Sequence, residues 1–140
     1  MRTHSATLSL ALIALAALSI SGCSGNGNKE AAALTEVHVK LSEFKVEMDK
    51  TSLPAGPVKF IIENAGMVVH EVVLESAGAD DKPFEQGGKE SEVENIEPGK
   101  SATLEWMIDK AGSYQLACHI TGAEDHYAHG MKIEFTVTPP

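Results

Sequence analysis

The amino-acid sequence predicts an all-β domain, built as a sandwich or barrel of short strands. Three observations support this prediction. Apolar and polar residues alternate in several short runs, as they do along a strand with one buried face. Turn sequences that contain Pro and Gly separate these runs at regular spacing. No convincing long helical pattern interrupts them, so the fold class is expected to be all-β.

The predicted strands follow one another from Leu34 onwards. Val37, Val39 and Leu41 alternate with polar residues, and a second run from Phe44 to Met48 alternates in a shifted phase. The shift indicates a bulge or bend near Ser42–Glu43. Further strands are predicted at residues 58–64, 67–74, 102–108, 114–120 and 131–137, with turns at residues 53–57, 64–66, 97–100 and 109–112.

The segment from Glu75 to Glu97 has a different composition. It holds eight acidic residues and two lysines, and its Gly and Pro residues would break a long helix. We therefore expect a long acidic connection with room for one helical turn. Such a charge run is more often a solvated loop than a specific docking surface.

The N-terminus resembles a bacterial lipoprotein signal. Arg2 precedes an apolar run from Leu8 to Ile20, which is too short for a membrane span. The run ends in Ile20-Ser21-Gly22-Cys23, which matches the aliphatic–small–small–Cys box of such signals. The resemblance implies cleavage before Cys23 and lipidation of Cys23. We expect residues 1–22 to be the signal peptide, residues 23–33 a flexible tether and residues 34–140 one domain, exported and lipid-anchored on the periplasmic or outer side of a membrane.

The charge balance excludes some partners. The chain has 20 acidic and 11 basic residues, a formal net charge of −9, and loss of Arg2 with the signal would make it more acidic. Such a protein is not attracted to nucleic acid or to an anionic bilayer by its charge. The lipid on Cys23, rather than a basic patch, would therefore hold it at the membrane.

The cysteine count draws attention to Cys118. The chain has only two cysteines, so lipidation of Cys23 would leave Cys118 without an intramolecular partner. A lone thiol outside the cytoplasm is either buried and inert or bound to something. Strand alternation places Cys118 on the inward face and His119 on the outward face.

Other soft and borderline donors surround this cysteine in the sequence. His126, His129 and Met131 follow within one loop, and His70 lies on an apolar strand upstream. Thiolate, imidazole and thioether ligands together suit copper better than a hard cation, although zinc could use most of the same donors. His38 falls on the polar face of its strand and is expected to be exposed.

With these residues in view, the domain resembles the cupredoxins, the plastocyanin- and azurin-like family of blue-copper proteins. The resemblance rests on Asn64-Ala65-Gly66 before His70, Glu97-Pro98-Gly99 before the Trp106 strand, Ala111-Gly112-Ser113-Tyr114 before Cys118, and His126 before Gly130-Met131. It covers residues 34–138 and implies a Greek-key β-sandwich or barrel. It also implies that His70, Cys118, His126 and Met131 bind one copper ion.

One departure from the family pattern concerns the second histidine. Relatives often carry Cys-x-x-x-Gly-His, but here Ala123 follows Gly122 and His126 stands eight positions after Cys118. The sequence favours His126 over His129 because its spacing to Met131 matches the family. His119 is the last choice because it faces outward.

The resemblance implies a function as well as a site. A type 1 (blue) copper protein cycles between Cu(I) and Cu(II) and carries one electron to or from a redox partner protein; we expect such a protein to be a monomer and not an enzyme. Copper delivery or sequestration in the periplasm is the alternative. An enzyme in which His119 binds a second copper would need more histidines than this chain offers.

Overall fold

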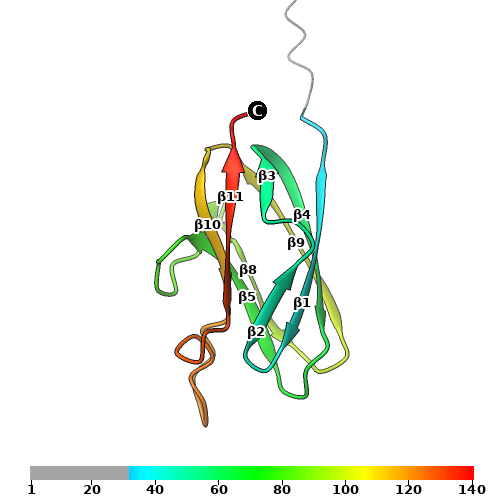
Figure 1. Cartoon of the computed structure of the whole chain (residues 1–140), viewed down its shortest axis with the longest axis vertical. Helices are drawn as coiled ribbons and strands as arrows, with labels where there is room; N and C mark the ends of the chain where they lie inside the picture. Colours follow the sequence, from blue (N-terminus) through cyan, green and yellow to red (C-terminus); the bar gives the residue numbers. More distant parts are fainter. Residues whose placement is uncertain (1–31) are drawn as a thin grey trace, which may run out of the picture. The chain divides into compact units, whose positions relative to one another are not determined.

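Eleven β-strands and no helix make up residues 32–140, the part of the chain that the computed structural model describes (Figure 1). The strands are β1 (Thr35–Ser42), β2 (Lys45–Met48), β3 (Ser52–Pro54), β4 (Gly56–Asn64), β5 (His70–Ser76), β6 (Glu85–Gln86), β7 (Lys89–Glu90), β8 (Glu92–Ile96), β9 (Ser101–Ile108), β10 (Gly112–Ala117) and β11 (Lys132–Thr138). The all-β prediction is confirmed. Within this range no helix has the length and apolar character needed to cross a membrane.

The signal peptide predicted at residues 1–22 and the lipidation predicted at Cys23 lie outside the described residues. So does all but the end of the predicted tether, residues 23–33. These assignments stay predictions.

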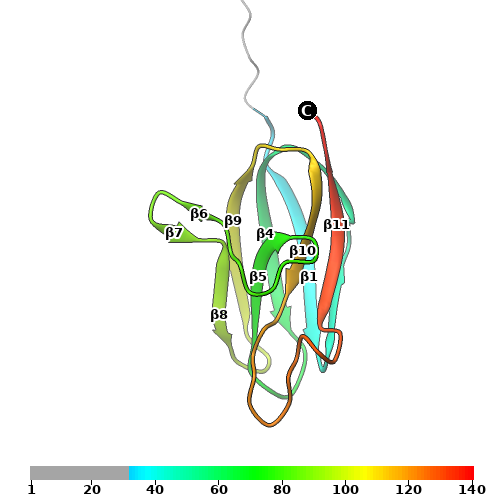
Figure 2. The same cartoon turned by 90° about the vertical axis from the view of Figure 1, so that its left-hand side faces the viewer.

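Two sheets form a Greek-key sandwich (Figures 1 and 2). One sheet has the order β2-β1-β4-β9 and the other the order β3-β11-β10-β5-β8. Strands β1 and β4 are parallel, as are β3 and β11, and the other neighbours are antiparallel. The chain changes sheet several times: β3 lies in the second sheet between β2 and β4 of the first, β5 and β8 are in the second, β9 returns to the first, and β10 and β11 end in the second.

The apolar faces of the two sheets meet in one core. Val37, Val39 and Leu41 of β1 are buried, whereas the intervening His38 is exposed as predicted. Phe60 of the first sheet and Leu116 of the second are completely buried. Each such side chain contributes about 1.5–3 kcal/mol by leaving water, which makes the sandwich a firm support for the loops at its ends.

The structure differs from the sequence prediction in two connections. The phase change at Ser42–Glu43 was predicted to be a bulge or bend, but it is a hairpin turn, because Ser42 pairs with Lys45 and β2 runs back along β1. The acidic segment also contains more strand than expected. It forms the small β6–β7 hairpin, which projects from the sandwich in Figure 2, and then the edge strand β8.

Strand β8 escaped prediction because its sequence is mostly polar and lacks a regular apolar alternation. Ile96 is buried and Val93 partly buried, whereas Glu94 and Asn95 face solvent. Its backbone pairs with β5 at the sheet edge. Charged residues on the open side of an edge strand commonly prevent pairing with a further strand. They also make the sequence resemble that of a solvated loop.

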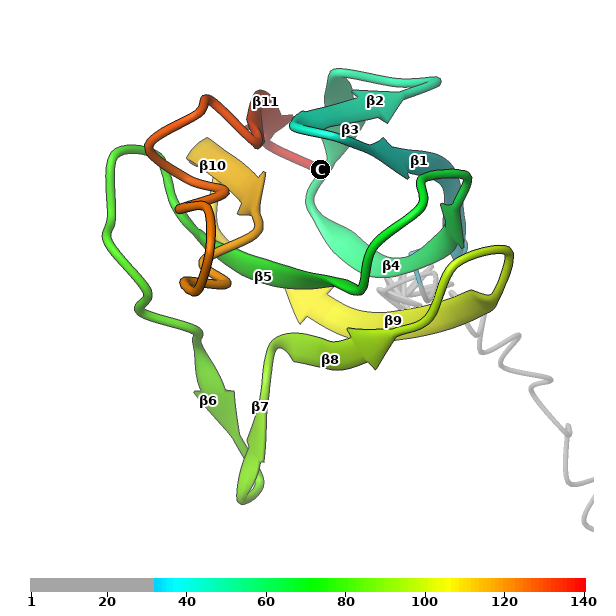
Figure 3. The ribbon, with the colours of Figure 1, turned by 90° about the horizontal axis from the view of Figure 1, so that it is seen from below.

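Four connections lie together at one end of the sandwich, shown from below in Figure 3: β1–β2, β4–β5, β8–β9 and β10–β11. The longest is β10–β11, residues 118–131, drawn in orange to red. Strands far apart in the sequence therefore deliver their terminal residues to the same place.

Candidate metal centre

Four side chains predicted as ligands come from the elements that meet at this end. His70 is the first residue of β5, and Cys118 directly follows β10. His126 lies in the β10–β11 loop, and Met131 directly precedes β11. The backbone positions of His70, Cys118 and Met131 are therefore set by the ends of strands, and only His126 lies within a loop.

Three of these side chains form a buried cluster. One donor atom each of His70, Cys118 and His126 lies within 4.8 Å of the others. The Nδ1 atom of His126 is 3.3 Å from the Sγ atom of Cys118 and 3.3 Å from the Nδ1 atom of His70. His70 and Cys118 are fully buried, and His126 is 6% exposed.

These distances suit a shared metal ion. In protein zinc sites the metal–nitrogen bond is about 2.0 Å and the metal–sulfur bond about 2.3 Å, which separates two donors by roughly 3.3–3.7 Å. The observed 3.3 Å separations fall at the edge of that range. Two imidazoles and one thiol, together with the thioether of Met131 at the end of the same loop, are the donor types of blue-copper sites. The residues present therefore fit copper.

Met131 is held at the cluster by its backbone. Its amide donates to the carbonyl oxygen of His126 at 3.0 Å, and its own carbonyl oxygen accepts from the Cys118 amide at 3.0 Å. The side chain is fully buried. Met131 therefore links both ends of the loop that carries Cys118 and His126.

The extra length between Cys118 and His126 is taken up by an ordered loop. The His126 amide donates to the carbonyl oxygen of Ile120, which fixes His126. A turn then begins at Asp125, whose side-chain Oδ1 atom accepts a hydrogen bond from the Ala128 amide at 2.9 Å. Gly130 ends it with a φ of 91°, a conformation that favours glycine. The chain can thus return to Met131 despite the longer loop.

Burial sets the protonation of the cluster in the absence of metal. Burial, and the neighbouring His126, lower the pKa of His70, so its imidazole is neutral and has a lone pair to donate. Burial raises the pKa of Cys118, so its thiol keeps its proton. A metal ion must displace that proton to gain the thiolate.

The structure places the two alternative histidines elsewhere. His129 is about half exposed, pairs with Glu124 at 2.7 Å and stacks on Phe44 with ring centroids 4.6 Å apart. Phe44 in turn contacts the His126 ring edge-on at 5.1 Å. Phe44 therefore lies between His129 and the His126 ring of the cluster.

His119 faces away from Cys118, as strand alternation predicts, but is not solvated. Its Nε2 atom is 2.8 Å from Glu75, and its ring stacks on Tyr127 at 4.5 Å. Gln115 donates to the same Glu75 oxygen at 2.7 Å. Burial would raise the pKa of Glu75, but hydrogen bonds from the Lys82 amide, Gln115 and His119 outweigh it and lower the pKa.

Sequence reasoning missed this polar cluster because a distant loop covers it. Glu75 and Gln115 are fully buried although both lie on the outer side of the sheet. The Gln115 amide also contacts the carbonyl oxygen of Ala79, in the segment that passes over this face. The signal in the sequence was a Glu and a Gln next to apolar residues of β5 and β10.

Asn64 is a second residue whose role sequence reasoning missed. It is fully buried at the end of β4, and its side-chain amide donates to the carbonyl oxygens of Val68 at 2.8 Å and Ile96 at 2.7 Å. Its side-chain oxygen accepts from the Gly66 amide at 2.9 Å. These bonds shape the β4–β5 loop that leads into His70.

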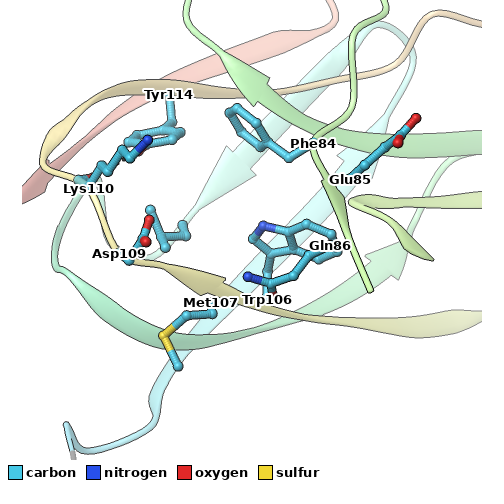
Figure 4. Close-up of a pocket in the computed structure, with 9 residues that line it drawn as sticks. Phe84, Glu85, Gln86, Trp106, Met107, Asp109, Lys110 and Tyr114 are labelled. Atoms are coloured by element: carbon cyan, nitrogen blue, oxygen red, sulfur yellow. Dashed lines mark hydrogen bonds between the residues drawn. The ribbon is translucent and has the colours of Figure 1, made fainter. Parts of the chain in front are cut away.

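A surface pocket of about 240 Å³ lies away from the cluster (Figure 4). Phe84, Trp106 and Tyr114 provide aromatic walls, and Asp109 and Lys110 provide charges of opposite sign. None of the four predicted ligands lines it. The pocket therefore adds nothing to the metal chemistry.

Comparison with known proteins supports the same interpretation. A family model described as a cupredoxin-like domain matches residues 9–131, most of the chain. The chain belongs to the cupredoxin-like family. This cupredoxin is also similar to solved structures. Auracyanin B is 25% identical with a TM-score of 0.56, over 80% of this chain and 93% of that chain. A dithionite-reduced auracyanin from Roseiflexus castenholzii is 21% identical with a TM-score of 0.53, over 78% and 99%.

Two further likenesses are more partial. A multicopper oxidase is 20% identical with a TM-score of 0.53, and the match covers 76% of this cupredoxin but only 42% of the oxidase chain. The copper-resistant cuproprotein CopI of Pseudomonas aeruginosa is 48% identical over 44 residues, 31% of this chain. That match spans 23% of the length of the curated relative. The oxidase likeness supports the fold, and the CopI likeness adds a short stretch of closer sequence similarity.

Proposed function

We propose that this protein is a one-electron carrier with a single copper ion bound by His70, Cys118, His126 and Met131. The observation that carries the proposal is the buried cluster of two imidazoles and one thiol at 3.3 Å separations. The donors come from separate segments that the sandwich brings together.

Each ligand has a role that follows from its surroundings. His70 and His126 direct their Nδ1 atoms to the common point, and Cys118 directs its sulfur there. Met131, whose backbone is hydrogen-bonded to Cys118 and His126, would supply the thioether donor. When bound, copper supplies reversible one-electron chemistry. Because strand ends and backbone hydrogen bonds hold the donors, they need to move little when the charge changes.

Burial also favours electron transfer over catalysis. A substrate has no direct access to His70 or Cys118, which are fully buried. His126 is slightly exposed and lies under Phe44, so this side of the loop offers the shortest approach for a redox partner protein. We therefore infer that the protein is not an enzyme.

Loading the protein with Cu(II) tests this function. An intense thiolate-to-copper absorption should appear in the visible range and disappear in Cys118→Ser. Voltammetry should then show a reversible one-electron couple, with the copper retained through repeated cycles. Absence of the absorption, or loss of copper on reduction, contradicts the electron-carrier proposal.

Copper sequestration or delivery is the second candidate. It is favoured by the 44-residue stretch that is 48% identical to CopI, a copper-resistant cuproprotein. In that case Cu(I) should pass readily to a competing chelator or acceptor protein. A carrier should retain it. The transfer rate measured with a colorimetric Cu(I) chelator therefore separates the two functions.

We also propose that the protein works outside the cytoplasm as a membrane-anchored monomer. The support is the Ile20-Ser21-Gly22-Cys23 box after an apolar run. An acidic chain of this kind would gain its place at the membrane from lipid rather than from charge.

A further inference from the structure

The second ring nitrogen of His70 has an unusual environment. Its Nδ1 atom faces Cys118 and His126, but its Nε2 atom is buried without a hydrogen-bond partner. A buried polar nitrogen left in this way costs roughly 1–3 kcal/mol. The carboxylate of Glu43 faces this nitrogen, with its Oε1 atom 3.6 Å away.

This carboxylate is hydrogen-bonded to the loop that leads into His70. The Oε1 atom of Glu43 accepts hydrogen bonds from the amides of Met67 at 2.5 Å and Val68 at 3.1 Å. These bonds also lower the pKa of Glu43, so the group is ionised. Glu43 itself lies in the β1–β2 turn, in the other sheet from His70.

Gly66 makes the arrangement sterically possible. A Cβ atom at this position would overlap the Glu43 carboxylate. The absence of a side chain at Gly66 therefore leaves room for Glu43 to reach the Met67 and Val68 amides and the far side of the His70 ring.

We propose that Glu43 is a positioning residue for His70. It receives the Nε2–H of the imidazole, which keeps the proton on Nε2 and leaves the Nδ1 lone pair directed at the cluster. Carboxylates that hold the far nitrogen of a ligand histidine also raise its basicity, and their loss typically costs 10–100-fold in metal affinity. The inference rests on the proposed copper site.

The separation of 3.6 Å is longer than a hydrogen bond, which requires about 2.7–3.2 Å. A shift of roughly half an ångström closes the gap. The Glu43 side chain is 35% exposed and can move by this amount, whereas the His70 side chain is fully enclosed. The contact is therefore one that the Glu43 side chain can complete.

Nitrogen NMR of the metal-free protein labelled in its histidines tests the positioning directly, at pH 8, where the imidazole is neutral. His70 should be the Nε2–H tautomer in the wild type and a mixture in Glu43→Ala. Glu43→Gln keeps an oxygen for the Met67 and Val68 amides, so the loop should stay folded, with less tautomer preference than wild type. Gly66→Ala should resemble Glu43→Ala because it displaces the carboxylate.

Copper affinity provides the second readout. Glu43→Gln should lower the affinity for Cu(II) about tenfold. The affinity for Cu(I) should fall less, because loss of a nearby negative charge weakens binding of the divalent ion more than binding of the monovalent ion. A tenfold loss confined to Cu(II) raises the reduction potential by about 59 mV. Glu124→Gln is the matched control, since it removes a carboxylate from the same end of the domain without facing His70.

The outcomes separate this inference from the proposed function. A pure Nε2–H tautomer of His70 in Glu43→Ala, or equal potentials in Glu43→Gln and Glu124→Gln, overturns the role of Glu43. If the wild type shows no thiolate-to-copper absorption, the proposed function fails, and the tautomer in the metal-free protein still decides what Glu43 does.

Discussion

The amide of Cys118 donates to the carbonyl oxygen of Met131 at 3.0 Å. This bond continues the ladder between β10 and β11, in which Ala117 pairs with Lys132. The sheet therefore fixes the positions of Cys118 and Met131, the two ends of the β10–β11 loop. The loop can lengthen between Cys118 and His126 without moving Cys118 or Met131, so the insertion relative to the family pattern leaves the cluster compact.

The three loop histidines should respond differently to replacement. His126→Ala should abolish the thiolate-to-copper absorption, because His126 lies 3.3 Å from both Cys118 and His70. His129→Ala and His119→Ala should keep it. Visible spectra of the three Cu(II)-loaded variants check this. Bleaching by His129→Ala alone would mean that the loop rearranges when metal binds.

The affinity for Cu(II) should rise with pH. Because burial raises the pKa of Cys118, the thiol is protonated below that value and must release its proton when copper binds. The logarithm of the association constant should therefore rise by about one per pH unit between roughly pH 7.5 and 8.5. Competition titrations with a chelator of known affinity provide the measurement.

Cys118→His serves as the control for this pH dependence. It offers a donor without a thiol proton, so the slope should flatten. His70 should contribute nothing to the slope, since its lowered pKa keeps the imidazole neutral over this range. A wild-type slope near zero would mean that Cys118 is already a thiolate in the metal-free protein.

Glu75 should stabilise the metal-free protein at neutral pH and not in acid. Its pKa is lowered in the folded state, so its contribution is present above the unfolded value of about 4.3 and disappears as the pH falls through the folded value. Glu75→Gln should therefore lose roughly 1–3 kcal/mol of unfolding free energy at pH 7. The two proteins should converge in strong acid.

Urea unfolding of both proteins across this pH range tests the prediction. Glu134→Gln is the control, because Glu134 is exposed on β11 and should change stability little at any pH. A constant difference between wild type and Glu75→Gln at all pH values would assign the effect to packing instead of ionisation.

The N-terminal prediction concerns Cys23. Mass spectrometry of the protein from its native membrane should find a chain that begins at Cys23 and carries acyl groups. Cys23→Ser should release the domain into the soluble fraction, because a chain with net negative charge has no electrostatic attraction to an anionic bilayer. An unmodified cysteine, or cleavage at another residue, would refute the anchor.

The sequence predicted those features that depend on local alternation. The burial of Val37, Val39 and Leu41 followed from period two, and so did the opposite faces of Cys118 and His119. Alternation and regularly spaced turns predicted the all-β fold class, and the position of His70 on an apolar strand marked it as a candidate ligand. These predictions succeeded because a strand with one buried face repeats its pattern along the chain itself.

Features that depend on distant partners were not predictable in this way. Strand β8 exists because β5 offers it an edge, and its own sequence is mostly acidic. Glu75 is buried by a segment that folds back over the sheet and donates the Lys82 amide to it. Glu43 approaches His70 only because the β1–β2 and β4–β5 turns share one end of the sandwich. Nothing in the local pattern marks these contacts.

The ends of the domain bear on how it can be studied on an electrode. Thr35 begins β1 and Thr138 ends β11 at the end of the sandwich opposite the histidine–cysteine cluster (Figure 1). A strand of eight residues spans about 26 Å, so a domain captured on gold through its C-terminus would keep the redox centre that far from the metal surface. Immobilisation through a residue of the β4–β5 loop, such as the exposed Met67 replaced by a cysteine, would bring the centre to the electrode.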